Sequence, residues 1–223
     1  DSNLGNTAGG VTFNGGTLEN TNSFTTARNI TLNSGGGTFR TDADLEVSGP
    51  ISGSGDLAKT GAANLTLTGS NTYTGDTTIS MGVLQIGNGG TTGSIVGDVN
   101  NNSVLSFNRS DDSSYGGAIS GIGGLNKEGD GRLVLTGENV YTGGTTIGGG
   151  TLQIGDGGTA GSIQGDVSNN GILSEGSGAT GGAVRFAVSC PWRRLRDGAR
   201  RRAVVTRFIR ACPLVGQHEH TLG

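Results

Sequence analysis

Two asparagines stand in matched surroundings, where an amide side chain could bind a ligand or bond to the main chain. Asn71 lies in the stretch LTGSNTYTG, and Asn139 lies in LTGENVYTG. Asparagine tolerates turn conformations, and its amide can pair with local backbone or with an asparagine of a neighbouring strand. This pattern favours a structural role. Tyr73 and Tyr141 share the same context and are expected to pack at corners rather than to bind sugar.

Gly-Asp dipeptides raise the question of calcium. Three of them end in Asp56, Asp98 and Asp166, and the calcium-binding nonapeptide β-roll also places an Asp in each turn. Here the nine-residue tandem period is absent, and Gly124 replaces Asp56 in the second half of an internal repeat. No phosphate-binding G-x-x-x-x-G-K-[ST] loop occurs either. We therefore predict no metal site and no cofactor.

Residues suited to catalysis are scarce. Up to Val184 the chain has no histidine, and its carboxylates fall mainly in expected turns. Apart from Asp98 and Asp166, these carboxylates differ between the two halves of the repeat, unlike the clustered acids of polysaccharide-cleaving enzymes. N-x-[ST] triplets begin at Asn29, Asn64, Asn101 and Asn108, as expected by chance in a chain rich in these residues. We predict no catalytic residues and no enzymatic activity.

An internal repeat organises these residues. Residues 51–106 align without a gap with residues 119–174, at an offset of 68 residues, and roughly 36 of the 56 aligned positions are identical. Within each copy, aliphatic pairs alternate with polar residues and are separated by Gly and Asn clusters. This alternation predicts short strands joined by tight turns, without helices.

The spacing of the strands indicates how they pack. Aliphatic strands recur at Leu65, Leu84, Leu105 and Leu125, and a much shorter step then leads to Leu133. Intervals of about 20 residues match one coil of a β-solenoid, so one repeat corresponds to about three coils. Seven or eight coils at roughly 4.8 Å each would measure about 35 to 40 Å.

Other β architectures fit less well. A β-propeller would show recurrent aromatic signatures, and aromatic residues make up only 4% of this chain. An antiparallel sandwich would show dipeptide hairpin turns, whereas the turns here are mostly longer. The prediction is an all-β chain that forms a right-handed, single-stranded parallel β-helix.

The repeat resembles the passenger-associated repeat of bacterial autotransporters. The resemblance lies in GDLAKTG, LTLTGSNTYTGDTTI and GVLQIG from Gly55 to Gly87, and in KEGDGRLVLTGENVYTGGTTIGGGTLQIGDGG from Lys127 to Gly158. A partial match, RNITLNSGGGTF, starts at Arg28. The resemblance implies a type V secretion passenger at the cell surface or secreted, which crosses the periplasm and folds as a β-helix outside. It brings no catalytic residues.

This resemblance implies a non-catalytic structural and export segment of a surface adhesin or secreted factor. Its implied partner is a C-terminal outer-membrane β-barrel translocator, and a host-surface or carbohydrate ligand is a further candidate. No barrel pattern follows residue 175, and the chain begins at Asp1 without the charged and apolar regions of a signal peptide, so a barrel and an export signal are both expected outside this chain. The alternative is a polysaccharide-binding or polysaccharide-cleaving β-helix.

The last part of the chain differs in composition. Residues 1–184 carry 6 Lys+Arg and 16 Asp+Glu, whereas the remainder carries 9 and 2, and contains both cysteines. An arginine cluster from Arg193 to Arg202 could bind nucleic acid, but the abrupt change favours a frameshifted or disordered tail. The rival interpretation is a capping helix around residues 195–210. We predict a β-helix over 1–175, an atypical tail over 176–223, and no nucleic-acid partner.

Overall fold

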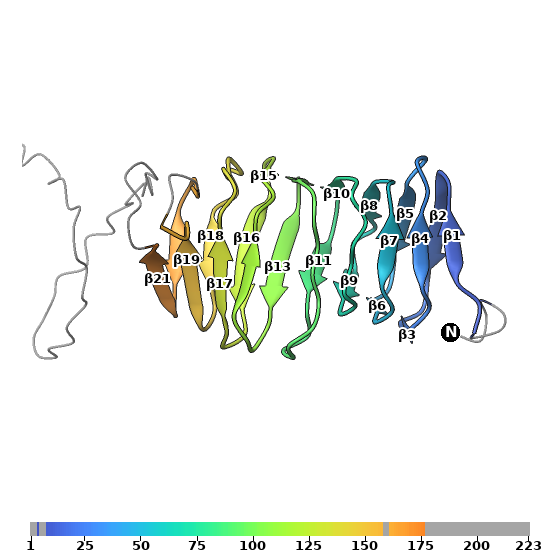
Figure 1. Cartoon of the computed structure of the whole chain (residues 1–223), viewed down its shortest axis with the longest axis horizontal. Coiled ribbons are helices and arrows are strands. Elements are labelled where there is room, and N and C mark those ends of the chain that lie inside the picture. Colours follow the sequence, from blue (N-terminus) through green and yellow to red (C-terminus); the bar gives the residue numbers. More distant parts are fainter. Residues whose placement is uncertain (1–3, 5–7, 158–160, 177–223) are drawn as a thin grey trace, which may run out of the picture. The chain divides into compact units, whose positions relative to one another are not determined.

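The described part of the chain is a parallel β-solenoid. A computed structural model describes residue 4, residues 8–157 and residues 161–176. Within these residues there are 21 strands of two to five residues and no α-helix, and the strands stack in coils from β1 to β21 (Figure 1). All of their pairings are parallel. The predicted all-β parallel solenoid is confirmed.

Each coil contributes to three faces, which we number. Face 1 is a six-stranded sheet with strands β2 (Gly16–Asn20), β5 (Gly37–Thr41), β8 (Leu57–Thr60), β10 (Thr77–Ile79), β12 (Val99–Asn101) and β15 (Ile119–Ser120). Face 2 is an eight-stranded sheet with strands β3 (Phe24–Thr26), β6 (Leu45–Val47), β9 (Asn64–Leu67), β11 (Val83–Ile86), β13 (Val104–Asn108), β16 (Gly124–Glu128), β18 (Thr145–Ile147) and β20 (Val167–Asn169). The eight strands of face 2 mark eight coils.

Face 3 consists of two sheets. The first contains β1 (Val11–Phe13), β4 (Ile30–Leu32) and β7 (Ile51–Gly53), and the second contains β14 (Ser113–Tyr115), β17 (Arg132–Leu135), β19 (Thr151–Ile154) and β21 (Ile172–Glu175). Between them the chain continues the stack without regular strands. There, the amides of Thr72 and Thr74 donate to the carbonyls of Ile51 and Gly53 in the coil below.

The core is a set of aliphatic columns inside the coils. Leu65 pairs with Leu84, Leu84 with Leu105, and Leu105 with Leu125, and all four are fully buried. The alternation and the regular spacing of the strands therefore predicted both the inward residues and their partners in the next coil. Each leucine is covered in part by its neighbours in the coils above and below, so burial of apolar surface depends on stacking.

The repeat unit is longer than three coils. It is three coils plus one face, so the second copy is rotated by one face relative to the first. β7 of face 3 corresponds in sequence to β15 of face 1, β8 to β16 of face 2, and β9 to β17 of face 3. The short step from Leu125 to Leu133 is the passage from face 2 to face 3. The predicted three coils per repeat therefore fall short by one face. The strand on this extra face is β14, which precedes the second copy.

Close approach at the corners requires glycine. Gly53 has φ +111°, and a Cβ atom placed there would lie 2.0 Å from the carbonyl oxygen of Leu32 in the coil below. Gly121, at the equivalent place in the second copy, has φ +100°. Such contacts explain much of the abundance of glycine in this chain.

The atypical tail predicted over residues 176–223 lies outside the described residues, except for Gly176. Its boundary and its nature stay predictions. No helix within the described ranges has the length and apolar character needed to span a membrane.

Candidate functional site

The predicted asparagines form the centres of two buried polar clusters. Asn71 is buried, and its Oδ1 accepts a hydrogen bond from the Ile51 amide at 2.8 Å, while its Nδ2 donates to the Ser94 carbonyl at 2.8 Å. The Ser94 hydroxyl in turn accepts a hydrogen bond from the main-chain N–H of Asn71 at 3.1 Å. Because Ile51 and Ser94 belong to the coils below and above, one side chain links three coils.

Asn139 repeats these contacts in the second copy. Its Oδ1 accepts from the Ile119 amide at 2.9 Å, and its Nδ2 donates to the Ser162 carbonyl at 2.8 Å. Both amides therefore bond to the main chain of neighbouring coils and not to one another. The structural role predicted for Asn71 and Asn139 agrees with this geometry.

The two tyrosines pack inside the same clusters. Tyr73 and Tyr141 are fully buried, and their hydroxyls are hydrogen-bonded to Thr77 Oγ1 and Thr145 Oγ1. Burial raises the pKa of Tyr73 to about 12, although the Thr77 hydrogen bond acts in the opposite direction. Burial also raises the pKa of Tyr141. Neither ring is available as a sugar platform.

Two buried lysines were not predicted from the sequence. Lys59 has no exposed area and Lys127 is 2% exposed, and each ammonium donates to three main-chain carbonyls at a corner. Burial lowers the pKa of Lys59 to about 8, and the nearby Asp42 carboxylate opposes this shift. The signal that could have revealed them is that the lysine is retained in both copies while its neighbours change from Ala58 and Thr60 to Asn126 and Glu128.

Three of the Gly-Asp carboxylates accept hydrogen bonds from backbone amides. Oδ1 of Asp56 accepts from the Asp76 amide, Oδ1 of Asp76 from the Asp98 amide, and Oδ1 of Asp98 from the Ala118 amide, at 2.8 to 3.1 Å. Each aspartate thereby caps the next coil at one corner. In the described part of the chain, no group of three or more His, Cys, Asp and Glu side chains is placed to hold a metal ion.

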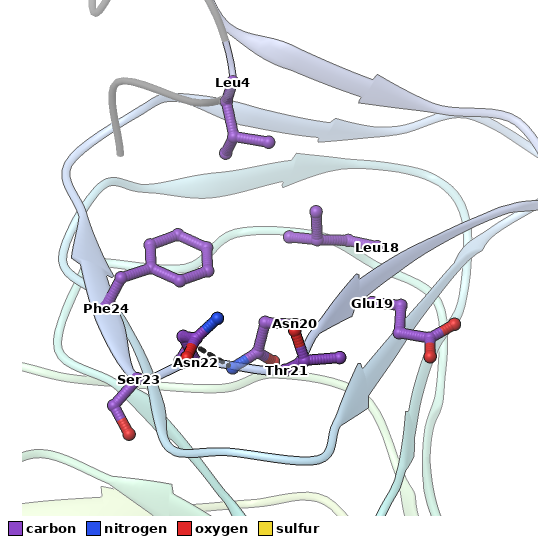
Figure 2. A pocket seen from close by; sticks show the side chains of 8 residues that line it. All are labelled: Leu4, Leu18, Glu19, Asn20, Thr21, Asn22, Ser23 and Phe24. Carbon is purple, nitrogen blue, oxygen red and sulfur yellow. Dashed lines mark hydrogen bonds between the residues drawn. The ribbon is translucent and has the colours of Figure 1, made fainter.

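A cavity of about 290 Å³ opens at the first coil (Figure 2). Leu18 and Phe24 point into it, Leu4 lies over it, and Glu19 points away. Leu18 pairs with Phe39 and Phe24 with Leu45 in the next coil, so the cavity walls belong to the interior columns. The cavity is the end of the apolar core and contains no catalytic pair.

The two copies differ in a systematic way. Each of the twenty buried residues in 51–106 is identical in the second copy, whereas 13 of the 19 exposed residues differ. The repeat has therefore kept its interior, including Lys59, Asn71 and Tyr73, while its surface has changed. A ligand site on the surface of both copies would instead have required its exposed residues to be retained.

Comparison with known proteins agrees with this architecture. The family model of the passenger-associated transport repeat matches residues 57–86 and 125–154. These two segments are passenger-associated transport repeats. They run from β8 to β11 and from β16 to β19, and each of these passenger repeats contains one Lys, Asn, Tyr and Thr of the buried clusters.

The passenger repeats lie in a longer region of similarity. The adhesin BmaC autotransporter of Brucella suis biovar 1 (strain 1330) is 44% identical over 186 residues, which is 80% of this chain and 5% of that protein. The chain thus spans a small part of the length of this relative. No solved structure matches the chain significantly.

Proposed function

We propose that the chain is a non-catalytic structural segment of an autotransporter passenger, which supports export and display of a surface adhesin or secreted factor. The observation that carries this proposal is the identity of all buried residues between the two copies, against a changed surface. What the duplication has maintained is the ability to stack. The passenger repeats and the similarity to an autotransporter adhesin support the same conclusion.

The stacking supplies a mechanism for export. Each coil buries its leucines and completes its hydrogen bonds only when the next coil docks, so folding can proceed coil by coil. A coil that has folded outside the membrane is too wide to slide back through a narrow pore. Progressive folding would therefore drive the chain outward without another energy source.

In this proposal the partner is a C-terminal outer-membrane β-barrel translocator, and the chain lies at the bacterial cell surface or is secreted after periplasmic transit. An adhesive role of the whole protein rests on the name of the partial relative. A host-surface or carbohydrate ligand would then be bound by other parts of that protein.

An export assay tests the proposal. The chain is placed between a signal peptide and a barrel translocator, and surface display is measured by protease accessibility on intact cells. Leu84→Asp places a charge in the core and is expected to reduce display severely, whereas Ser70→Asp changes an exposed residue and is expected to have little effect. Equal display of both variants would contradict the proposal.

A carbohydrate-array screen and a lyase assay on residues 1–175 test the alternative of a polysaccharide-binding or polysaccharide-cleaving β-helix. Specific glycan binding or cleavage would favour that alternative.

A further inference from the structure

Both lysines of the 223-residue chain have their amines inside the solenoid. The Lys59 Nζ donates to the carbonyls of Thr60, Gly61 and Met81 at 2.9, 2.8 and 2.9 Å. Thr60 is the last residue of β8 and Gly61 follows it, and Met81 belongs to the same corner one coil later. The ammonium therefore connects two successive coils from within.

The second copy builds the same arrangement at a different corner. The Lys127 Nζ donates to the carbonyls of Glu128, Gly129 and Gly149, with the longest of the three contacts at 3.3 Å. Lys59 lies on face 1 and Lys127 on face 2. The geometry is thus a property of the repeat and does not depend on the face on which it lies.

The binding groups are main-chain atoms. Thr60 is replaced by Glu128 and Met81 by Gly149, yet the carbonyls at these positions bind the ammonium in both copies. A Cβ atom at Gly82 would lie 2.8 Å from the Lys59 Nζ, so glycine leaves room for the cation beside Met81. Gly150 holds the equivalent place, and both glycines have positive φ.

The charge has no close acidic partner. In the parts of the chain that the structure describes, no carboxylate lies within ion-pairing distance of either ammonium. Asp42 acts on Lys59 from further away, and Asp130 and Glu128 act on Lys127. Carbonyl oxygens are therefore the direct ligands, as they are for many bound cations.

We propose that each passenger repeat contains a binding site for a primary ammonium ion, made of three main-chain carbonyls of two coils and occupied by the chain's own lysine. This inference goes beyond the proposed function and stands independently of it. The third carbonyl comes from the following coil, so the site is complete only after that coil has docked. The lysine thus holds the corner closed once two coils are in place.

Amine acylation of the folded chain tests the occupancy. With N-hydroxysuccinimidyl acetate, we expect modification of the α-amino group only, and modification of Lys59 and Lys127 only after unfolding. Arg132 is exposed, so the variant Arg132→Lys supplies a matched reactive amine on the surface. Acylation of Lys59 and Lys127 in the folded chain as fast as that of the introduced lysine would overturn the proposal.

Chemical rescue tests the ligand class. Lys59→Ala should lower the melting temperature by about 5 to 10 °C, because three corner carbonyls lose their donors. Ethylammonium chloride should restore part of this loss, whereas tetramethylammonium chloride, which has no N–H donor, should not. Lys59→Met fills the space without a donor and should be destabilised without rescue. A methionine variant as stable as the parent, or equal effects of both salts, would show that the side chain only fills space. Should the alanine variant not fold, the acylation result decides.

Discussion

Asn71 and Asn139 make equivalent hydrogen bonds on two different faces of the solenoid. Asn71 links the coils on face 3, where its Oδ1 accepts from the amide of Ile51, and Asn139 does so on face 1 from the amide of Ile119. The two asparagines therefore lie on different faces of the solenoid, while their hydrogen bonds to the neighbouring coils are the same. The polar cluster is a local property of the passenger repeat.

Asn71→Ala should destabilise the chain by about 2 to 4 kcal/mol, because the Ile51 amide and the Ser94 carbonyl would lose their partners in a buried place. The free energy of unfolding from urea titration measures the effect. Ser70→Ala changes the exposed neighbour and is the matched control. Equal stability of the two variants would show that water replaces the amide.

The three tyrosines of the chain should resist ionisation. Burial raises the pKa of Tyr73 to about 12, and it also raises those of Tyr115 and Tyr141. Because tyrosines of the unfolded chain ionise near pH 10, stability should fall as the pH rises above about 10. Phenolate absorbance should therefore appear together with loss of circular dichroism. A phenolate signal near pH 10 in the folded chain would contradict this prediction.

Lys59 should make the folded chain more stable as the pH rises, whereas the tyrosines make it less stable. Its pKa is about 8 in the folded chain, mainly because of burial, whereas an unfolded lysine titrates near 10.4. Between these values the unfolded state binds more protons, so this group adds stability as the pH rises. The stability difference between the parent and Lys59→Met should therefore widen from pH 8 to pH 10. A difference that stays constant would mean that the amine keeps its ordinary pKa.

Calcium should not stabilise the chain. The carboxylates of Asp56, Asp76 and Asp98 each accept a hydrogen bond from the backbone of the next coil. We expect equal melting temperatures in calcium chloride, in EDTA and in sodium chloride of matched ionic strength. A calcium-dependent increase that EDTA reverses would require a metal site at this corner.

Deletion of residues 180–223 should leave the melting temperature nearly unchanged, if the tail is frameshifted or disordered. The sequence supports this expectation, because Glu175 and Gly176 take the places of Phe107 and Asn108, and the repeat pattern ends there. Thermal unfolding of the truncated chain and of the parent makes the comparison. A large loss of stability would favour the capping helix.

The strands were well predicted from the sequence. Period-2 alternation marks which residues of a strand point inward, and an interval of about 20 residues marks where the chain returns to the same face. The regular recurrence of Leu65, Leu84, Leu105 and Leu125 is enough to place them in one column, and their pairing confirms it. The rotation between the copies is visible in the sequence only as the short step from Leu125 to Leu133. This step can be read as a passage from one face to the next only when the number of faces per coil is known, and alternation alone does not reveal that number.

The buried lysines could not be predicted from residue type, since lysine is normally exposed. Their carbonyl ligands are main-chain atoms, which leave no mark in the sequence. For Asn71 the structural role was predicted, but the partners were not, because Ile51 and Ser94 become neighbours only after the coils stack.

The rotation by one face has a consequence for display. If 68-residue repeats followed one another in tandem, a surface group copied with each repeat would lie on the next face of the solenoid each time. Three repeats, or about ten coils and roughly 48 Å, would bring it back to its original side. A flat host surface could then meet the same group only once in every three repeats, while the other two would remain open to other partners.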